Sequence, residues 1–345
     1  MTEIVTQSKR GRIEYIDGIR GVGALMVAVQ HPFERAFPAY LEWSAQYVSL
    51  GRVGIVAFFL VSGYVVGLTL SGQTARTFTV RRFWRLYPTY WLATIAYVVA
   101  AVATGEAQLD YSIFVIAVNI TMIQGFVGMT SILGVGWTLG IEIAFYAQSV
   151  LGKLTRLLDK TVWLGLAWLG LFVAMGIGNF AFGTDFSAVM PLMMYTGSVG
   201  FALYLRERNR SRALTTLVIV GLTIMPVAAW LVEGDSRGTS GTVMSFLISY
   251  YAGAAVFAVS YALRSRETPK LLLSLGATSY ALYLFHEVVM AALAPLVGAP
   301  LLYVPLNVTA SLAIAWAIHL LVEKPSITRG RKLTPTRREQ TVLVE

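Results

Sequence analysis

The chain contains no cysteine and only three histidines among its 345 residues. The lack of cysteine excludes disulfide bonds, a cysteine-ligated metal ion and a thiol nucleophile. Because His31, His286 and His319 are widely spaced in the sequence, a metal site has little to build on, and we expect no metal. A serine nucleophile has no support either, since the sequence lacks the G-x-S-x-G motif of serine hydrolases.

Charged residues are also scarce. They make up 13% of the chain, whereas hydrophobic residues make up 56%. Apolar runs of about 18 to 25 residues recur from end to end, and this is the length that a helix needs to cross a bilayer. The polar N-terminus does not resemble a cleavable signal peptide, and we expect no soluble domain of useful length. We therefore predict an all-α, polytopic integral membrane protein.

The basic residues are grouped along the chain. All but three of the 27 lie in the segments 9–20, 76–85, 153–160, 206–212, 264–270 and 324–338. Basic groups that alternate with apolar runs are typical of the cytoplasmic loops of membrane proteins. This pattern, and not a nucleic-acid partner, accounts for the net charge of +9. It predicts a multi-pass protein of the plasma (inner) membrane with both termini in the cytoplasm.

The apolar runs predict about ten membrane-spanning helices. We place them near residues 18–36, 51–70, 84–103, 137–153, 161–181, 188–205, 213–232, 242–263, 272–296 and 301–322. The stretch 111–133 is broken by glycines, and residues 110–152 are too few for three full crossings. We therefore expect a re-entrant or interfacial segment at about 111–133 that lines the site. Residues 17–325 form the predicted transmembrane domain, with cytoplasmic tails at 1–16 and 326–345.

Arg20 and His31 lie in the first of these helices. A histidine within the hydrocarbon layer is costly, and ionisable groups there usually face a cavity and carry function. Arg20 lies where the helix leaves the cytoplasm, so membrane topology alone also accounts for it. Together the two residues indicate a site inside the membrane that handles a proton and an anion.

Two further ionisable residues are predicted at the depth of His31, in the outer half of the membrane. Counting the helical rise of about 1.5 Å per residue brings Glu142 and His286 to the same layer. A carboxylate beside a histidine orients its ring and favours the imidazolium that forms on proton abstraction. Glu34, one turn after His31, is an alternative partner. Purely structural interpretations stay open for Glu142 and His286, and we favour one for His319.

A third group of charges lies where the third helix leaves the cytoplasm. Arg81, Arg82 and Arg85 are spaced so that Arg85 shares a helical face with its predecessors. Arginine side chains match the oxygens of phosphate groups, so this cluster is suited to a phosphorylated cytoplasmic ligand. Anchoring by the positive-inside rule explains the cluster equally well.

Six segments, in order along the chain, resemble the signatures of the acyltransferase 3 family of integral-membrane O-acyltransferases. The segment YIDGIRGVGALMVAVQH (15–31) resembles the arginine–ten residues–histidine motif of its first helix, carried here by Arg20 and His31. The others are VGIVAFFLVSGYVVG (53–67), RRFWRLYPTYW (81–91), GWTLGIEIAFY (136–146), SYALYLFHEVV (279–289) and EKP (323–325). Thr138 stands where the family usually has serine.

The resemblance implies transfer of an acyl group, usually acetyl, to a hydroxyl of a carbohydrate, glycolipid or small-molecule acceptor. In this interpretation His31 is the general base, Glu142 orients it, and His286 binds the acceptor or stabilises the oxyanion. The donor is cytoplasmic acetyl-CoA or another acyl-CoA, and four arginines bind its phosphates: Arg20, Arg81, Arg82 and Arg85. We expect no fused SGNH hydrolase domain, because only the polar segment 326–345 follows the last predicted helix.

Two other functions suit a membrane protein with buried ionisable groups. One is a proton-coupled transporter or exporter, and the other is a transmembrane acyl carrier that serves a second transferase. Transporters commonly contain inverted repeats with paired broken helices, and the sequence shows neither. An acyl carrier would share the donor site but would yield no acylated acceptor by itself.

Overall fold

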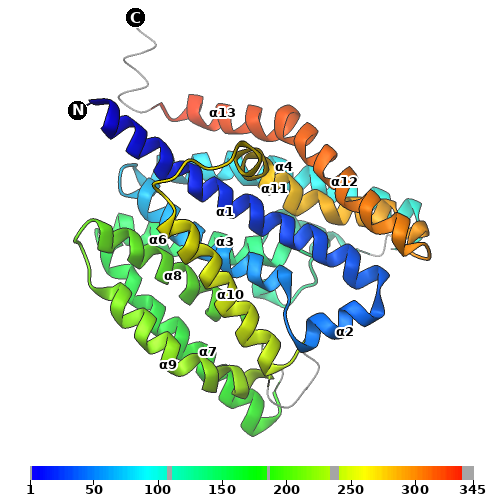
Figure 1. Ribbon diagram of the computed structural model, residues 1–345, viewed down its shortest axis with the longest axis horizontal. Coiled ribbons are helices and arrows are strands. Elements are labelled where there is room, and N and C mark those ends of the chain that lie inside the picture. The colour runs from blue at the N-terminus through cyan, green and yellow to red at the C-terminus, as the bar shows by residue number, and fades with distance from the viewer. Residues whose placement is uncertain (1, 107–110, 185–186, 234–240, 336–345) are drawn as a thin grey trace, which may run out of the picture.

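The protein is a bundle of long helices (Figure 1). The structure is a computed structural model that describes residues 2–106, 111–184, 187–233 and 241–335, and these ranges contain helices but no strand. The long helices are α1 (Thr2–Ala36), α3 (Leu50–Leu70), α4 (Ala75–Ala103), α6 (Gly136–Leu154), α7 (Leu164–Phe182), α8 (Val189–Glu207), α9 (Ala213–Glu233), α10 (Val243–Ala262), α11 (Lys270–Ala292) and α12 (Pro300–Ile318). The short ones are α2 (Pro38–Gln46), α5 (Ile113–Ile120), α13 (Lys324–Leu333), three 3-10 turns and one π-helical turn, η4 (His319–Glu323).

Each predicted span corresponds to one of the ten long helices, which confirms the predicted all-α, polytopic fold. Within the described ranges, seven helical stretches are long and apolar enough to cross a membrane. The helices α1, α6 and α8 fall outside that set. Two of them, α1 and α6, carry His31 and Glu142, whereas His286 lies on α11, which belongs to the set of seven.

Helix α1 runs through the middle of one half of the bundle. It packs against α3 and α11, and it also contacts α10 and α12 (Figure 1). Its approach to α11 is very close, because a Cβ atom on Gly21 would lie only 2.6 Å from the backbone nitrogen of Gly276. Small residues at such crossings let the backbones of membrane helices approach each other. The pairing of α1 with α11 therefore depends on these two glycines.

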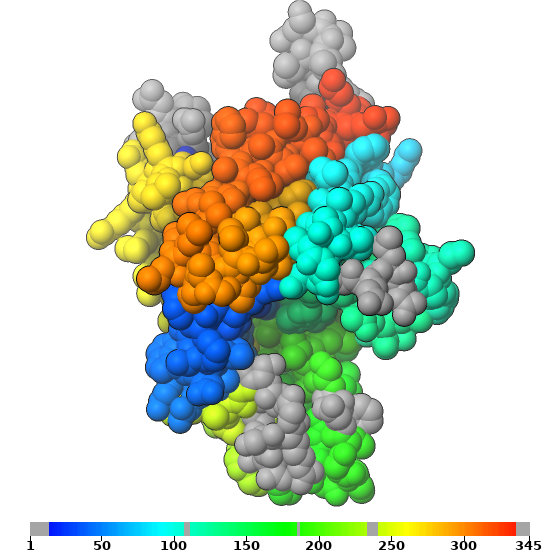
Figure 2. Space-filling model, turned by 90° about the vertical axis from the view of Figure 1, so that its right-hand side faces the viewer, coloured from blue at the N-terminus to red at the C-terminus, as the bar shows by residue number. Residues whose placement is uncertain are grey.

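The other half of the bundle consists of α7, α8, α9 and α10. Helix α3 joins the halves, since it packs against α1, α8 and α10 and most of its residues are buried. Figure 1 shows α7 and α9 on the far side of the bundle from α12 and α13. Figure 2, turned by 90°, shows α12 and α13, in orange to red, beside α4 in cyan. The candidate site residues lie in the half that contains α1, α4 and α11.

The stretch 111–133 contains only the eight-residue helix α5 and a single 3-10 turn. A helix of eight residues is too short to cross a bilayer, which requires about 20. Buried Asn119 holds the segment together, because its amide donates to the carbonyl of Thr130 at 3.1 Å and accepts from the N–H of Ile132 at 2.9 Å. The hydroxyl of Tyr90 in α4 donates to the carbonyl of Asn119 at 3.0 Å. The segment is therefore broken, as predicted, and the structure shows in addition that it is fastened to α4.

Helical structure extends beyond the boundaries predicted for the two tails. α1 begins at Thr2, and α13 continues to Leu333, past the predicted end of the domain at residue 325. Pro325 lies in the first turn of α13, directly after the π-helical turn η4, and helical structure is continuous from Pro300 to Leu333. The motif EKP therefore lies within one long helical stretch, where the π-helical turn passes into α13. Residues 336–345 of the predicted C-terminal tail lie outside the described residues.

Candidate active site

His31 and His286 stack on each other between α1 and α11. Their ring centroids are 5.4 Å apart, and the ring planes differ by 7°. Each histidine lies ten residues beyond the glycine that forms the close crossing, Gly21 in α1 and Gly276 in α11. The two helices therefore run parallel and in register from the glycines to the histidines. The pair differs in access, since the His31 side chain is 37% exposed and His286 is fully buried.

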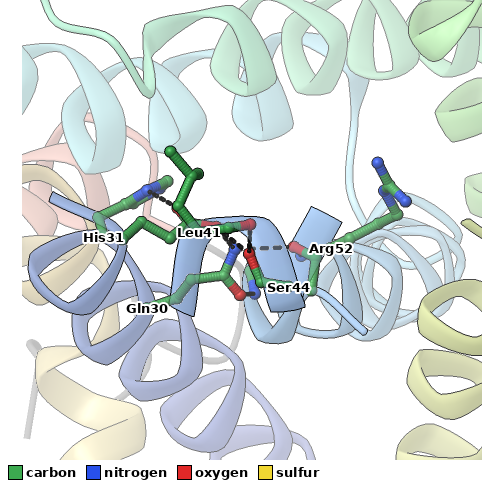
Figure 3. A network of polar contacts seen from close by, with 8 residues as sticks. Gln30, His31, Leu41, Ser44 and Arg52 are labelled. Atoms are coloured by element: carbon green, nitrogen blue, oxygen red, sulfur yellow. Dashed lines mark hydrogen bonds and ion pairs between the residues drawn. The ribbon is translucent and has the colours of Figure 1, made fainter. Parts of the chain in front are cut away.

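Glu34 is the carboxylate that contacts His31. Its Oε2 atom lies 3.3 Å from Nδ1 of His31. Its other oxygen accepts hydrogen bonds from the Gln30 amide at 2.6 Å and from the Ser44 hydroxyl at 3.0 Å (Figure 3). An ionised carboxylate only accepts hydrogen bonds, so this contact places a proton on Nδ1 of His31, and in the neutral ring the lone pair is then on Nε2.

Helix α2 and the start of α3 hold this carboxylate in place. The amide of Gln30 also donates to the Ser49 hydroxyl at 2.8 Å and accepts from the N–H of Gly51 at 2.6 Å. The same Ser49 hydroxyl caps α3, because it accepts from the N–H of Arg52 at 3.2 Å (Figure 3). Segments from 30 to 52 thus form one hydrogen-bonded support for His31.

His286 is also fixed through its Nδ1 atom, which lies 3.3 Å from the carbonyl oxygen of Leu282. A carbonyl oxygen only accepts hydrogen bonds, so this contact places the proton on Nδ1. The Nε2 atom is buried and has no hydrogen-bond partner within the described ranges. Both histidines therefore present an Nε2 atom with a free lone pair.

The carboxylate of Glu142 is placed differently from the expectation. It contacts the Ser62 hydroxyl at 3.4 Å and accepts a hydrogen bond from the Tyr146 hydroxyl. The carboxylate that lies against His31 is instead that of Glu34. The predicted pairing of Glu142 with His31 is therefore replaced by the alternative that the sequence left open.

The starting depth of α6 explains this difference. The prediction counted the rise from a helix that begins at the outer membrane surface. In the structure, a Cβ atom on Gly134 would lie 2.6 Å from Oε1 of Glu287, the residue after His286. Because α6 begins near that level, Glu142 lies about 9 Å further from the histidine pair along the helix.

Three cavities follow one another through this half of the bundle. The first, of about 170 Å³, lies between α4 and α13 and is lined by Arg81, Arg82, Arg85 and Arg331. The second, of about 30 Å³, shares Arg82 and Arg85 with the first and also contains Arg20 and Glu142. The third, of about 30 Å³, shares Arg20 and Tyr280 with the second and reaches Thr138 and Tyr283. Tyr283 is one helical turn before His286, so the series ends just below the histidine pair.

The guanidinium of Arg20 lies between the second and third cavities. It forms an ion pair with Asp17, with 3.8 Å between Nη1 and Oδ1, and its side chain is 13% exposed. It also interacts electrostatically with Glu142, Glu323 and Arg85. Glu323 is itself 2% exposed and lies 3.0 Å from Nδ1 of His319. Arg20 is therefore the cationic centre of a buried charge cluster, a position that membrane topology alone does not require.

Arg81 has a structural contact that the sequence did not reveal. Its guanidinium donates to the hydroxyl and carbonyl of Thr334, at 3.0 and 2.7 Å, and Thr334 is the C-cap of α13. Arg82 instead lies over the rings of Phe78 and Tyr146, at 5.0 and 4.9 Å from their centroids. Of the predicted arginine cluster, Arg81 thus fastens α13 to α4, while Arg82 and Arg85 reach the second cavity.

A hydroxyl pair at the inner side of the histidines was not predicted. The hydroxyls of Thr138 in α6 and Tyr283 in α11 are 2.7 Å apart, and both residues line the third cavity. The sequence offered one signal, because Thr138 keeps the hydroxyl of the serine that it replaces. Within the described residues, no group of three or more His, Asp or Glu side chains is arranged to hold a metal ion.

Comparisons with known proteins agree with the resemblance seen in the sequence. A family model described as an acyltransferase domain matches residues 13–320. The exopolysaccharide production protein ExoZ of Rhizobium meliloti (strain 1021) is 24% identical over 308 residues, which cover 84% of this chain and 94% of that protein. Nodulation protein 10 of Rhizobium leguminosarum bv. viciae is 25% identical over 324 residues, which cover 82% of this chain and 84% of that protein. No solved structure matches significantly.

The matched region contains most of the site. It begins before Arg20 and ends after His319, so the histidine pair, Glu34, the arginine cluster on α4 and all of α6 fall within it. One family model thus covers most of the helical bundle and of the site, and the chain belongs to the acyltransferase 3 family of integral-membrane acyltransferases.

Proposed function

We propose that the protein transfers an acyl group, acetyl in the simplest case, from cytoplasmic acyl-coenzyme A to a hydroxyl of a carbohydrate acceptor. The observation that carries this proposal is that the histidine pair can be reached from two ends of the bundle. From one end, cavities lined by arginines lead to within a turn of His286. At the other end, His31 is 37% exposed beside α2. Donor and acceptor therefore reach the histidine pair from opposite ends of the bundle.

The groups along the donor molecule match the linings of the successive cavities in charge. Coenzyme A carries its phosphates at one end and its thioester at the end of a long neutral arm. Arginine side chains bind phosphate oxygens through charge-assisted hydrogen bonds. We place the diphosphate at Arg82 and Arg85, with the arm passing Arg20 into the third cavity. That cavity is lined mostly by apolar residues, which suits the thioester end of the arm.

His31 is the general base in this proposal. Its Nε2 atom takes the proton from the acceptor hydroxyl, and the hydroxyl oxygen attacks the carbonyl carbon of the thioester. The new C–O bond forms, the C–S bond breaks, and the sulfur leaves with the electron pair. The proton held by His31 passes to this sulfur, so free coenzyme A leaves as the thiol. Glu34 holds the ring orientation and stabilises the imidazolium that exists between the two proton transfers.

The neighbouring polar groups receive supporting roles. We assign the hydroxyl of Tyr283 as donor to the oxyanion that develops on the thioester carbonyl, with the hydroxyl of Thr138 donating to Tyr283, because both residues line the cavity that the thioester enters. His286 presents a buried Nε2 lone pair, which suits a hydrogen bond from a second hydroxyl of the acceptor. Glu142 acts further in, where it balances the charge of the arginines around the donor.

A carbohydrate acceptor and an outer location are supported by two observations. The relatives are named for exopolysaccharide production and for nodulation. The basic groups of the sequence lie in the loops predicted to be cytoplasmic, with both termini on that side of the plasma (inner) membrane. The acceptor then meets His31 from the outer side, while acyl-CoA remains inside.

The proposal is tested with purified protein reconstituted in nanodiscs, which leave both ends accessible. We expect labelled acetyl from acetyl-CoA to appear on an oligosaccharide fraction of the cell envelope, and we expect none with His31→Ala. Mass spectrometry of envelope glycans, with and without the gene, identifies the acceptor. An active His31→Ala variant would overturn the assignment of the base. Solute flux in sealed vesicles without acyl transfer would favour a transporter, and donor hydrolysis without acylated product would favour an acyl carrier.

A further inference from the structure

Helix α13 forms part of the wall of the first cavity, which is the largest of the three. Arg331 and Ile327 of α13 line it together with three arginines of α4. Figure 2 shows α13 beside α4 at the surface of the molecule, and Arg331 is exposed. The sequence placed this residue in a cytoplasmic tail, outside the domain. The structure therefore adds a fourth arginine to the cavity mouth.

Three contacts fix α13 at this position. Gly330 lies against Trp84 of α4, because a Cβ atom on Gly330 would be 2.9 Å from Cβ of Trp84. The guanidinium of Arg329 lies over the Trp84 ring, 4.8 Å from its centroid. Arg81 holds the last turn of α13 through Thr334. With α13 fixed from both sides of Gly330, Arg331 has a defined place at the cavity.

The cavity arginines lie at two levels. Arg82 and Arg85 line both the first and the second cavity, so they form the deeper level. Arg81 and Arg331 line the first cavity alone. Because Arg81 already binds Thr334, Arg331 is the cation of the outer level that is best placed for a ligand.

Coenzyme A also carries its charge at two levels. Its diphosphate adjoins the neutral arm, and a separate phosphate monoester is attached to the 3′-oxygen of the ribose, further from the thioester. If the thioester lies innermost, the diphosphate reaches the deeper arginines and the 3′-phosphate reaches the mouth. We infer that Arg331 binds the ribose 3′-phosphate of the donor and that α13 is part of the donor site. This inference rests on the proposed function.

The phosphate that Arg331 meets has two conceivable sources, since anionic lipid headgroups also carry phosphate at the membrane surface. The 3′-phosphate is favoured because Arg331 lines a cavity continuous with the deeper arginines. The matched control is Lys332, the next residue on the same helix, which is also exposed and does not line the cavity.

The experiment measures binding of acetyl-CoA and of 3′-dephospho-acetyl-CoA to the full-length protein by titration calorimetry in nanodiscs of phosphatidylcholine. We expect Arg331→Gln to weaken acetyl-CoA binding about tenfold to a hundredfold, the usual effect of losing a hydrogen bond to a charged group. Binding of the dephospho analogue should be unchanged, so the variant loses discrimination between the two donors. Lys332→Gln should retain it. Melting temperatures near that of the wild type show that α13 is still docked.

Other outcomes would overturn the inference. Equal loss of affinity for both donors in Arg331→Gln would mean that the residue acts through the position of α13 or through the electrostatic field of the whole cavity. Loss that occurs only in nanodiscs containing phosphatidylglycerol would assign Arg331 to lipid headgroups. An unchanged variant would remove it from the donor site. If the wild-type protein binds neither donor, the proposed function fails instead, and this result is distinct from the other three.

Discussion

The rings of His31 and His286 lie nearly parallel, with centroids 5.4 Å apart. Each ring has its Nδ1 atom against a hydrogen-bond acceptor, Glu34 for His31 and the carbonyl of Leu282 for His286. The two histidines therefore have the same tautomer but different access. His286 is fully buried, whereas the His31 side chain is 37% exposed. This difference in access is the reason why we propose His31 as the base and give His286 a binding role.

The first prediction separates the two histidines. His31→Ala should lower kcat by about 10² to 10⁴-fold, which is the usual contribution of a general base. His286→Phe keeps a ring in the stack but removes Nε2, so it should raise KM for the acceptor more than it lowers kcat. Steady-state kinetics with both substrates varied measures this difference. If the two variants lose activity in the same way, the assignment of separate roles is wrong.

The second prediction compares the two carboxylates. Glu34→Gln removes the charge that faces His31, so kcat should fall about tenfold or more while KM for acyl-CoA stays the same. Glu142→Gln should instead change KM for acyl-CoA, because Glu142 lies in the cavity with Arg82 and Arg85. Kinetics of the two variants at several donor concentrations provide the test. A kcat effect confined to Glu142→Gln would restore the pairing that the sequence predicted.

Much of this site was accessible from the sequence because α1 and α11 are regular. Both enter from the predicted cytoplasmic side, and both carry their histidine at a countable distance from the entry. A depth count therefore brought His31 and His286 together, and the structure stacks them. The sequence also identified Glu34 by its spacing from His31. Pro32 lies within that turn, and α1 continues through it to Ala36.

The depth count along the helices failed where the chain is irregular. The depth of Glu142 depends on where α6 begins, and the broken segment 111–133 decides that. Hydrogen bonds of Asn119 and Tyr90 fix this segment, and such contacts leave no periodic pattern in the sequence. The contact of Arg81 with Thr334 joins residues 253 positions apart. Pairings of this kind follow from tertiary packing, which a helix-by-helix interpretation does not include.

The third prediction concerns the deeper arginines. Arg85→Gln should raise KM for acyl-CoA about tenfold or more and leave KM for the acceptor unchanged, since the lost interaction is a charge-assisted hydrogen bond to phosphate. The control is Arg76→Gln in the first turn of α4, which is exposed and does not line the cavities. Initial rates over a range of donor concentrations show the effect. Equal KM values for the two variants would remove Arg85 from the donor site.

The fourth prediction tests the close crossing of α1 and α11. Gly276→Val places side-chain atoms where the backbone of Asp17 lies, so we expect a loss of about 1 to 3 kcal/mol in stability, as for other overpacked sites. Gly170→Val is the matched control, because no atom outside its own stretch of helix backbone lies within 4 Å of the position of its Cβ. Thermal unfolding in detergent, followed by circular dichroism, should show a lowered melting temperature for the first variant alone. Similar melting temperatures would show that the helices separate without cost.

The fifth prediction uses the absence of cysteine, which makes the wild-type protein a blank for thiol labelling. Glu42→Cys introduces a thiol on exposed α2, and Arg266→Cys introduces one in the exposed turn between α10 and α11. A membrane-impermeant maleimide added to intact spheroplasts should label Glu42→Cys and should label Arg266→Cys only after lysis. This result would place His31 toward the outside and the arginine-lined cavity toward the cytoplasm. The opposite labelling pattern would place His31 toward the cytoplasm and the arginine-lined cavity toward the outside. Acyl-CoA would then have no route from the cytoplasm to the arginines.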